Sequence, residues 1–102
     1  MEVGESVLVL ITYDVNTETN AGKQRLRKVA KECQKYGHRV QNSVFECVMD
    51  NVKCRQVKEK LLKLIDQDRD SLRFYYLGDK YKKKVEHFGI KPSLDIEDPL
   101  II

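Results

Sequence analysis

An acidic residue at the end of an apolar run is the first candidate for chemistry in this chain. Asp14 directly follows the run Val7–Tyr13, which is rich in branched side chains and predicts a strand buried on both faces. A carboxylate there is costly to desolvate unless it lies at the strand end, is paired or binds a metal. Because the segment 16–20 is polar, we expect Asp14 where the core opens to solvent, as a Mg²⁺ ligand or as the cap of a turn or helix.

Basic residues form the second group of candidates. The segment 22–36 holds a dense set of cations: Arg25, Arg27, Lys28 and Lys31. Arg27 and Lys31 are neighbours on a helix, where like charges cost some stability unless an anion compensates them. A second cluster, Lys80, Lys82, Lys83 and Lys84, surrounds Tyr81. Both clusters suit contact with a phosphate backbone, and both also suit a solvated surface.

Length and net charge set further limits. A chain of 102 residues forms one domain, which we expect to span 1–102 with a loose leader at 1–6 and a tail at 90–102. The net charge of +3 does not by itself identify a nucleic-acid binder. The segment 90–102 contains three acids and one lysine, so the remainder has 18 basic and 13 acidic residues. A basic body with an acidic tail is compatible with phosphate contact.

The cysteine and histidine residues form no recognisable ligand pattern. Cys33, Cys47 and Cys54 have no CxxC spacing, and an odd number of cysteines favours reduced thiols in the cytoplasm. His38 and His87 are isolated, so a zinc site is not expected. Either histidine could act as a general acid or base, or simply lie in the surface or core. The N-terminus has neither the charge pattern of a signal peptide nor the length to cross a membrane.

Hydrophobic periodicity predicts strand 7–15, helix 22–36, strand 38–49, helix 51–66, strand 71–77 and a short strand 85–88. Gly37 fits a left-handed cap at the end of the first helix, and Asp50 or Asn51 fits the cap that begins the second. The segment 38–49 is not cleanly alternating, so we expect a bend or bulge near Asn42 and Ser43. The firm elements follow the order strand–helix–strand–helix–strand. The order becomes strand–helix–strand–strand–helix–strand if the long middle segment and the aromatic segment are counted with a short fourth strand.

This order predicts a ferredoxin-like α+β sandwich of the type βαββαβ, with both helices on one face of an antiparallel sheet. The other face would be bare in a single subunit. Because the first strand is apolar on both faces, we expect a symmetric homodimer to cover it. Twofold symmetry would then bring Asp14 from both subunits toward one axis, where a cation would relieve the repulsion between the carboxylates.

Four stretches read together resemble one protein family over roughly residues 7–102. They are VLITYDV at 9–15, RLRKVA at 25–30, RVQNSVFEC at 39–47, and the ending from KPS at 91–93 to PLII at 99–102. The chain is similar to CRISPR-associated protein two, and most similar to members from type I-C systems. The resemblance implies a ferredoxin-like homodimer whose C-terminal strand crosses to the partner's sheet. It also implies a metal-dependent endonuclease acting on double-stranded DNA or single-stranded RNA. A further implied role is that of a scaffold in spacer acquisition, between dimers of CRISPR-associated protein one, the integrase.

The same resemblance assigns roles to individual residues. Asp14 matches the catalytic acid and the ligand for Mg²⁺, or for Mn²⁺ as the alternative. Tyr13 and Ser43 match further catalytic positions, where Ser43 could donate to a phosphate oxygen or a metal-bound water, and Phe45 matches a supporting position near the acid. Tyr13 and Phe45 also suit the core. The resemblance implies that Arg25 or Arg27 contacts phosphate and that Arg39 is a further functional arginine. The charge clusters add Lys31 and the lysines Lys80, Lys82, Lys83 and Lys84 as predicted contacts to nucleic acid.

Three other functions remain open at this stage. A non-catalytic nucleic-acid scaffold would keep the dimer and lose the cleavage. A toxin-type ribonuclease would use the same fold outside CRISPR immunity. A single-stranded RNA binder of the RRM type would use the aromatic residues Phe74, Tyr75 and Tyr76, although the chain lacks the glycine and basic pattern of that motif.

Overall fold

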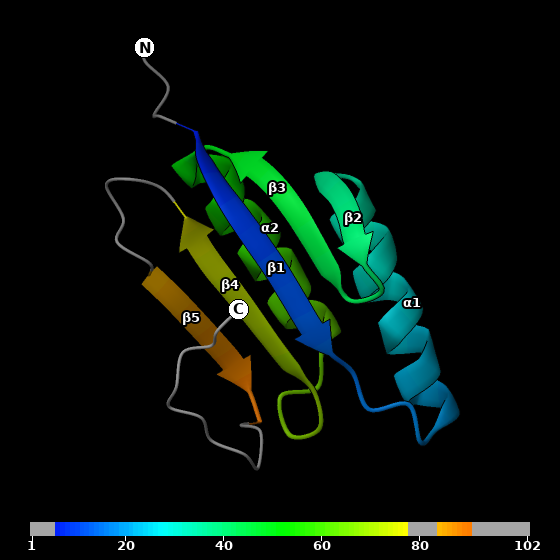
Figure 1. Ribbon diagram of the computed structural model, residues 1–102. Helices are drawn as coiled ribbons and strands as arrows, with labels where there is room; N and C mark the ends of the chain where they lie inside the picture. Colours follow the sequence, from blue (N-terminus) through cyan, green and yellow to red (C-terminus); the bar gives the residue numbers. More distant parts are fainter. Residues whose placement is uncertain (1–5, 78–83, 91–102) are drawn as a thin grey trace.

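A computed structural model describes residues 6–77 and 84–90, which form one antiparallel sheet with two helices (Figure 1). The elements in chain order are β1 Val7–Asp14, α1 Asn20–Gln34, β2 Gly37–Gln41, β3 Val44–Met49, α2 Asn51–Leu64, β4 Ser71–Leu77 and β5 Lys84–Gly89. The strand order across the sheet is β2-β3-β1-β4-β5, and every pairing is antiparallel. This is the predicted ferredoxin-like α+β arrangement, with β5 added beside β4.

The second helix begins as the sequence predicts, and the first does not. The Asp50 side chain accepts a hydrogen bond from the Lys53 amide at 2.8 Å and so caps α2. In α1 the cap is Thr19, whose hydroxyl accepts from the Gly22 amide at 3.0 Å. The helix therefore begins two residues before the predicted start, because Thr19 in the polar loop caps it.

Gly37 does not form the predicted left-handed cap. It is the first residue of β2, opposite Cys47 of β3, and its backbone lacks the positive φ that such a cap needs. A Cβ at this position would lie 2.4 Å from the Cys47 Sγ and 2.5 Å from the Glu46 carbonyl oxygen. The glycine is therefore needed for close approach of two strands.

The predicted bend near Asn42 and Ser43 is a hairpin turn. The long segment 38–49 divides there into β2 and β3, which pair with each other with a register shift between Arg39 and Gln41. This turn explains why neither alternate set of residues in the segment is cleanly apolar. It also brings Ser43 back to β1, where its carbonyl accepts a hydrogen bond from the Tyr13 amide at 3.1 Å.

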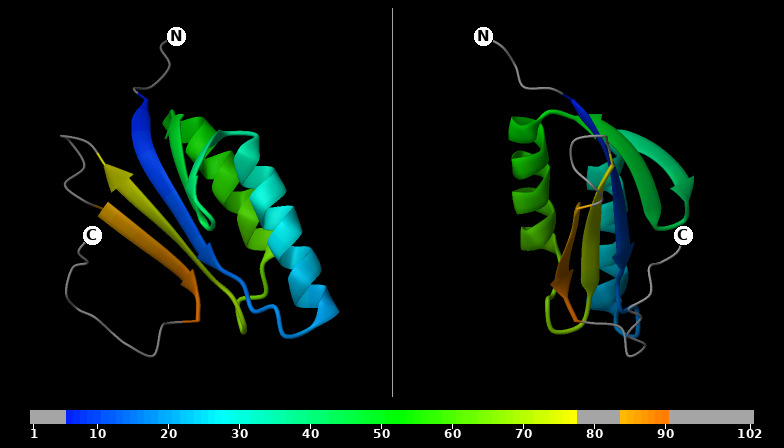
Figure 2. Two further views of the ribbon diagram at one scale, coloured as in Figure 1. Left: turned by 45° about the vertical axis from the view of Figure 1, so that its right-hand side comes forward. Right: turned by 60° about the vertical axis from the view of Figure 1, so that its left-hand side comes forward.

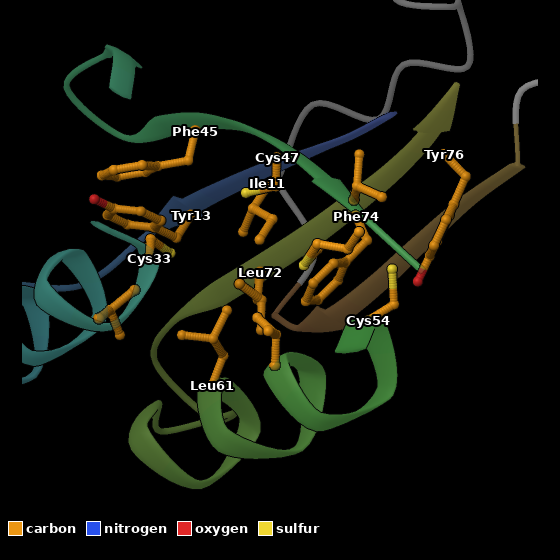
Figure 3. Close-up of a cluster of buried hydrophobic side chains, with 14 of the residues drawn as sticks. Ile11, Tyr13, Cys33, Phe45, Cys47, Cys54, Leu61, Leu72, Phe74 and Tyr76 are labelled. Carbon is orange, nitrogen blue, oxygen red and sulfur yellow. The ribbon is translucent and has the colours of Figure 1, made fainter. Parts of the chain in front are cut away.

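The core lies between the sheet and the helices (Figure 3). Alternate residues of β1, β3 and β4 meet the inner stripe of α2, and Ile11, Phe45, Leu61, Leu72 and Phe74 are fully buried. All three cysteines are free and buried in this core. Burial raises the pKa of Cys33 to about 12 and that of Cys47 to about 11, so both stay protonated thiols at neutral pH.

The prediction that β1 is buried on both faces is wrong for the single subunit. Its residues alternate between buried and half-exposed, because no helix of the described chain lies over the second face of the sheet, here called the open face (Figure 2). The open face becomes more polar along β1. Leu8 lies between Val48 and Leu77, and Leu10 lies between Glu46 and Tyr75. Farther along, Thr12 lies beside Arg73, and Asp14 beside Ser71.

Candidate active site at the end of β1

Asp14 lies where the sequence predicts, at the end of a central strand. It is the last residue of β1, it is exposed, and it pairs in register with Ser71 of β4. Strand alternation places its carboxylate on the open face, while Tyr13 points to the helices. The carboxylate therefore lies at the polar end of a face whose other end is apolar.

The neighbouring row of the open face carries a fixed arginine. The Arg73 Nε donates to the His87 Nδ1 at 3.0 Å, and its Nη1 donates to the Tyr75 hydroxyl at 3.2 Å. Because a guanidinium only donates, the Nδ1 of His87 accepts and its Nε2 carries the proton, 2.8 Å from the Ile90 carbonyl oxygen. His87 thus holds Arg73 one register row from Asp14.

Tyr13 and Phe45 belong to the core, on the helix side of the sheet. Both are buried, and their rings stack with centroids 6.2 Å apart and an angle of 21° (Figure 3). The Tyr13 hydroxyl lies 3.4 Å from the Asn42 carbonyl oxygen, to which it donates. Burial raises the pKa of Tyr13, an effect that Arg39 only partly offsets. The ring therefore joins β1 to the β2–β3 turn and carries no ionised oxygen at neutral pH.

Arg39 and Ser43 are both close to this stack. The Arg39 guanidinium carbon lies 5.1 Å from the centroid of the Phe45 ring, a cation–π distance, and the residue is otherwise exposed. Ser43 is half-buried in the turn beside Tyr13. Two of the predicted residues, Asp14 and Ser43, are thus brought to one end of β1, while Arg39 lies on the helix side.

Arg25 has a structural partner that the sequence analysis missed. Its Nε lies 2.8 Å from one carboxylate oxygen of Asp70, and its Nη2 lies 3.2 Å from the other. The Asp70 side chain is completely buried, whereas 18% of the Arg25 side chain is exposed. The one signal in the sequence was an acid directly before an apolar strand, in a turn that holds other acids.

Asp70 also makes the stability of the fold depend on pH. Burial would raise the pKa of its carboxyl, but Arg25 and the backbone amides of Asp66 and Asn16 together lower it below its usual value. The stabilisation by the ionised form is complete above the unfolded-state value near 3.8, and it is lost as the pH falls through the lower folded value.

We therefore expect the free energy of unfolding to fall less steeply between about pH 5 and pH 2.5 in Asp70→Asn than in the natural protein. Urea unfolding at several pH values measures this. Asp68→Asn removes an exposed carboxylate of the same turn and should leave the slope unchanged. Equal slopes in all three proteins would contradict the assigned pKa direction.

The remaining predicted cations divide into two sets. Arg27 and Lys31 are exposed on α1 and take part in none of the ion pairs found in the described part of the chain. Lys80, Lys82 and Lys83 lie outside the described residues, as does the tail from residue 91. The backbone of Lys84 begins β5, which confirms the short last strand.

Comparison with known proteins decides the family. The model of the family "CRISPR associated protein Cas2" matches residues 7–85. The chain belongs to the Cas2 family. A Cas2 protein from Halalkalibacterium halodurans, named a CRISPR-associated endonuclease, is 62% identical over 95 residues, which are 93% of this chain and 99% of that protein. One from Nitratidesulfovibrio vulgaris, named an endoribonuclease, is 53% identical over 98 residues and 96% of each chain.

Solved structures agree with the fold. The Cas2 crystal structure from Streptococcus pyogenes at pH 6.5 has a TM-score of 0.66 and 58% identity, over 70% of this chain and 86% of that one. Another Cas2 crystal structure, 23% identical, has a TM-score of 0.62 over 96% of this chain and 98% of its own. Membership of the family confirms the resemblance found in the sequence, while the assignment to type I-C stays a prediction.

Proposed function

We propose that this Cas2 protein is a homodimeric, divalent-metal-dependent endonuclease whose catalytic acid is Asp14. The observation that carries the proposal is the position of Asp14, whose exposed carboxylate lies at the polar end of the open face. Some of its relatives are named endonucleases and others endoribonucleases, and both names support nuclease activity. Double-stranded DNA and single-stranded RNA are both retained as substrates.

The open face supports a homodimer. Val48 is 67% exposed and Val85 is 50% exposed on it, next to half-buried Leu8 and Leu77. Contiguous apolar surface of this kind is normally covered by a partner. If a second copy covers the apolar end about a twofold axis, the polar ends of both faces lie at the margin of the contact, with Asp14 from each subunit accessible to substrate.

The donor set fits a cation only when two subunits contribute. Among the described residues no group of three or more His, Cys, Asp and Glu side chains could hold a metal ion. Mg²⁺ commonly takes one or two carboxylates and completes its shell with water, so the two copies of Asp14 would hold it, with Mn²⁺ as the alternative. When bound, such an ion polarises a phosphate and activates water for its hydrolysis.

Nucleic acid would be held by exposed cations. Lys23, Arg27 and Lys31 follow one another at four-residue spacing along α1 and are all exposed. Together with Arg39 and the lysines at 80–84 they would contact phosphates without reading the sequence. The RRM-type alternative is not supported, because Phe74 and Tyr76 are buried against the helices and only Tyr75 of these three aromatic residues lies on the open face.

A scaffold role with the integrase, CRISPR-associated protein one, in the cytoplasm is part of the same proposal. A second candidate, a scaffold without catalysis, is favoured by the single carboxylate that each subunit offers at the end of β1. A function as a toxin-type ribonuclease is not supported, because the chain belongs to the Cas2 family. In the described residues no helix is long and apolar enough to span a membrane.

The test is cleavage of matched DNA duplexes and RNA single strands by the purified protein, with EDTA, Mg²⁺ or Mn²⁺ present. We expect cleavage only with a divalent ion. Log affinity measured in EDTA should fall linearly with log salt concentration. The double variant Arg27→Gln/Lys31→Gln should lower that slope by about two on DNA, since each contact contributes about 0.9.

The matched control is Arg55→Gln/Lys63→Gln, which removes the same charge from exposed positions of α2. Its slope should equal that of the natural protein. If the protein binds nucleic acid with a steep salt slope but does not cleave it with any metal, the non-catalytic scaffold is the function that remains. No binding at all would overturn both candidates.

A further inference from the structure

The carboxylate of Asp70 is the one buried charged group in the described part of the chain, and four donors surround it. One oxygen accepts from the Asn16 amide at 3.0 Å and the Arg25 Nη2 at 3.2 Å. The other accepts from the Arg25 Nε and the Asp66 amide, each at 2.8 Å. A buried ion so fully satisfied holds its donors in fixed positions, because releasing any of them leaves charge unpaired in the interior.

One of these donors, the Asn16 amide, belongs to the segment that leaves the candidate active site. Asn16 is the second residue after Asp14, so the Asp70 carboxylate fixes the backbone just beyond the catalytic acid. The other side of this segment rests on α1. A Cβ at Gly22 would lie 1.9 Å from the Asn16 carbonyl oxygen, so the glycine is required for this contact.

Asp70 also fixes the strand on which Asp14 rests. Its neighbour Ser71 is the register partner of Asp14, and its own carbonyl accepts from the Ile90 amide at 3.0 Å beyond β5. The Asp70 amide donates to the Asp66 carbonyl at 2.7 Å. The carboxylate therefore joins the segment just beyond β1, α1 and the turn before β4, and the backbone carbonyl of the same residue joins the end of β5.

We propose that Asp70 and Arg25 are positioning residues for Asp14, holding the end of β1 so that its carboxylate keeps the direction that metal binding needs. The inference rests on the proposed function and adds a supporting pair to it. It also assigns Arg25 a role other than the phosphate contact that the sequence suggested. A residue that positions a metal ligand changes the rate or metal affinity, whereas a phosphate contact changes nucleic-acid affinity.

The experiment compares Arg25→Gln and Asp70→Asn with the natural protein, well below their unfolding temperatures. Arg25→Gln is the milder change because the Arg25 side chain reaches solvent. This variant therefore provides the test if Asp70→Asn does not fold. The control is Asp68→Asn, which removes an exposed carboxylate from the same turn. The measurements are kcat, KM, the metal concentration for half-maximal rate, the salt slope of binding in EDTA, and amide exchange of residues 15–19.

For positioning residues we expect kcat or metal affinity to fall by about 10- to 100-fold in both variants. KM and the salt slope should stay within about twofold, and the Asn16 amide should exchange about tenfold faster or more. Arg25→Lys should restore part of the loss, since it keeps the charge and one donor. Asp68→Asn should match the natural protein throughout.

Other results would overturn the inference. A raised KM and a smaller salt slope in Arg25→Gln, with kcat unchanged, would make Arg25 a phosphate contact. Unchanged exchange at Asn16 would show that the pair does not hold the end of β1. If the natural protein cleaves nothing, the proposed function fails by itself, and faster exchange at Asn16 in both variants would still support the role of Asp70 in fixing this segment.

Discussion

Replacing Asp14 with asparagine is expected to lower the rate of cleavage by about 100- to 1,000-fold, the range seen when one preorganised group that stabilises transition-state charge is lost. The substitution keeps the size of the side chain and removes its charge. A neutral amide is a weak ligand for a hard cation, so the dimer would lose both of its carboxylate ligands at once. Because Asp14 is exposed at a strand end, the fold should not change. Single-turnover cleavage at saturating metal measures the effect.

The control for this experiment is Glu46→Gln, which removes another exposed carboxylate, two register rows away on the same face. It should cleave at the natural rate, and both variants should elute as dimers with unchanged thermal midpoints. Full cleavage by a clean Asp14→Asn preparation would contradict the assignment of Asp14. A loss of equal size in Glu46→Gln would show a general effect of charge on this face.

Mixed dimers test whether one ion is shared. If natural and Asp14→Asn subunits are mixed equally and exchange freely, about one quarter of the dimers carry two aspartates and about half carry one. A shared site that needs both carboxylates should keep about a quarter of the activity. Two independent sites should keep about half, because each natural subunit would then act alone.

The sequence predicted those features of the site that depend on strand periodicity. The position of Asp14 followed from the apolar run before it, and the opposite directions of Asp14 and Tyr13 followed from alternation. The burial of Phe45 agrees with the preference of a large aromatic residue for the core, and not with alternation, because the segment 38–49 does not alternate cleanly. The prediction that β1 is buried on both faces failed for the single subunit, because a sequence does not distinguish a face covered by helices from one left for a partner.

The network around Asp70 could not be predicted for a different reason. Its members come from the β1–α1 loop, α1 and the α2–β4 turn, and only the tertiary fold brings them together. In the sequence Asp70 ends a turn with two other acids, Asp66 and Asp68, and any of them could have been a solvated charge. Arg25 likewise stands among other cations of α1, and only the structure separates it from Arg27.

Replacing Val48 with glutamate is the second change for which we expect a large effect. Val48 is 67% exposed in the subunit, so a charged side chain there should leave the fold intact. If the open face is the dimer contact, the new carboxylate would be buried without a partner, which costs about 3–5 kcal/mol. The dimer dissociation constant should then rise by about 100-fold or more, which sedimentation or light scattering over a range of concentrations measures.

Val52 provides a closely matched control, because it is the same residue type with 66% exposure but lies on α2, away from the open face. Val52→Glu introduces the same charge, so any general effect on nucleic-acid binding appears in both variants. Since cleavage would need Asp14 from two subunits, Val48→Glu should lose cleavage at low protein concentration and regain it as the concentration rises. If the dimer persists in Val48→Glu and dissociates in Val52→Glu, the subunits make contact through their helices. The two copies of Asp14 would then lie apart.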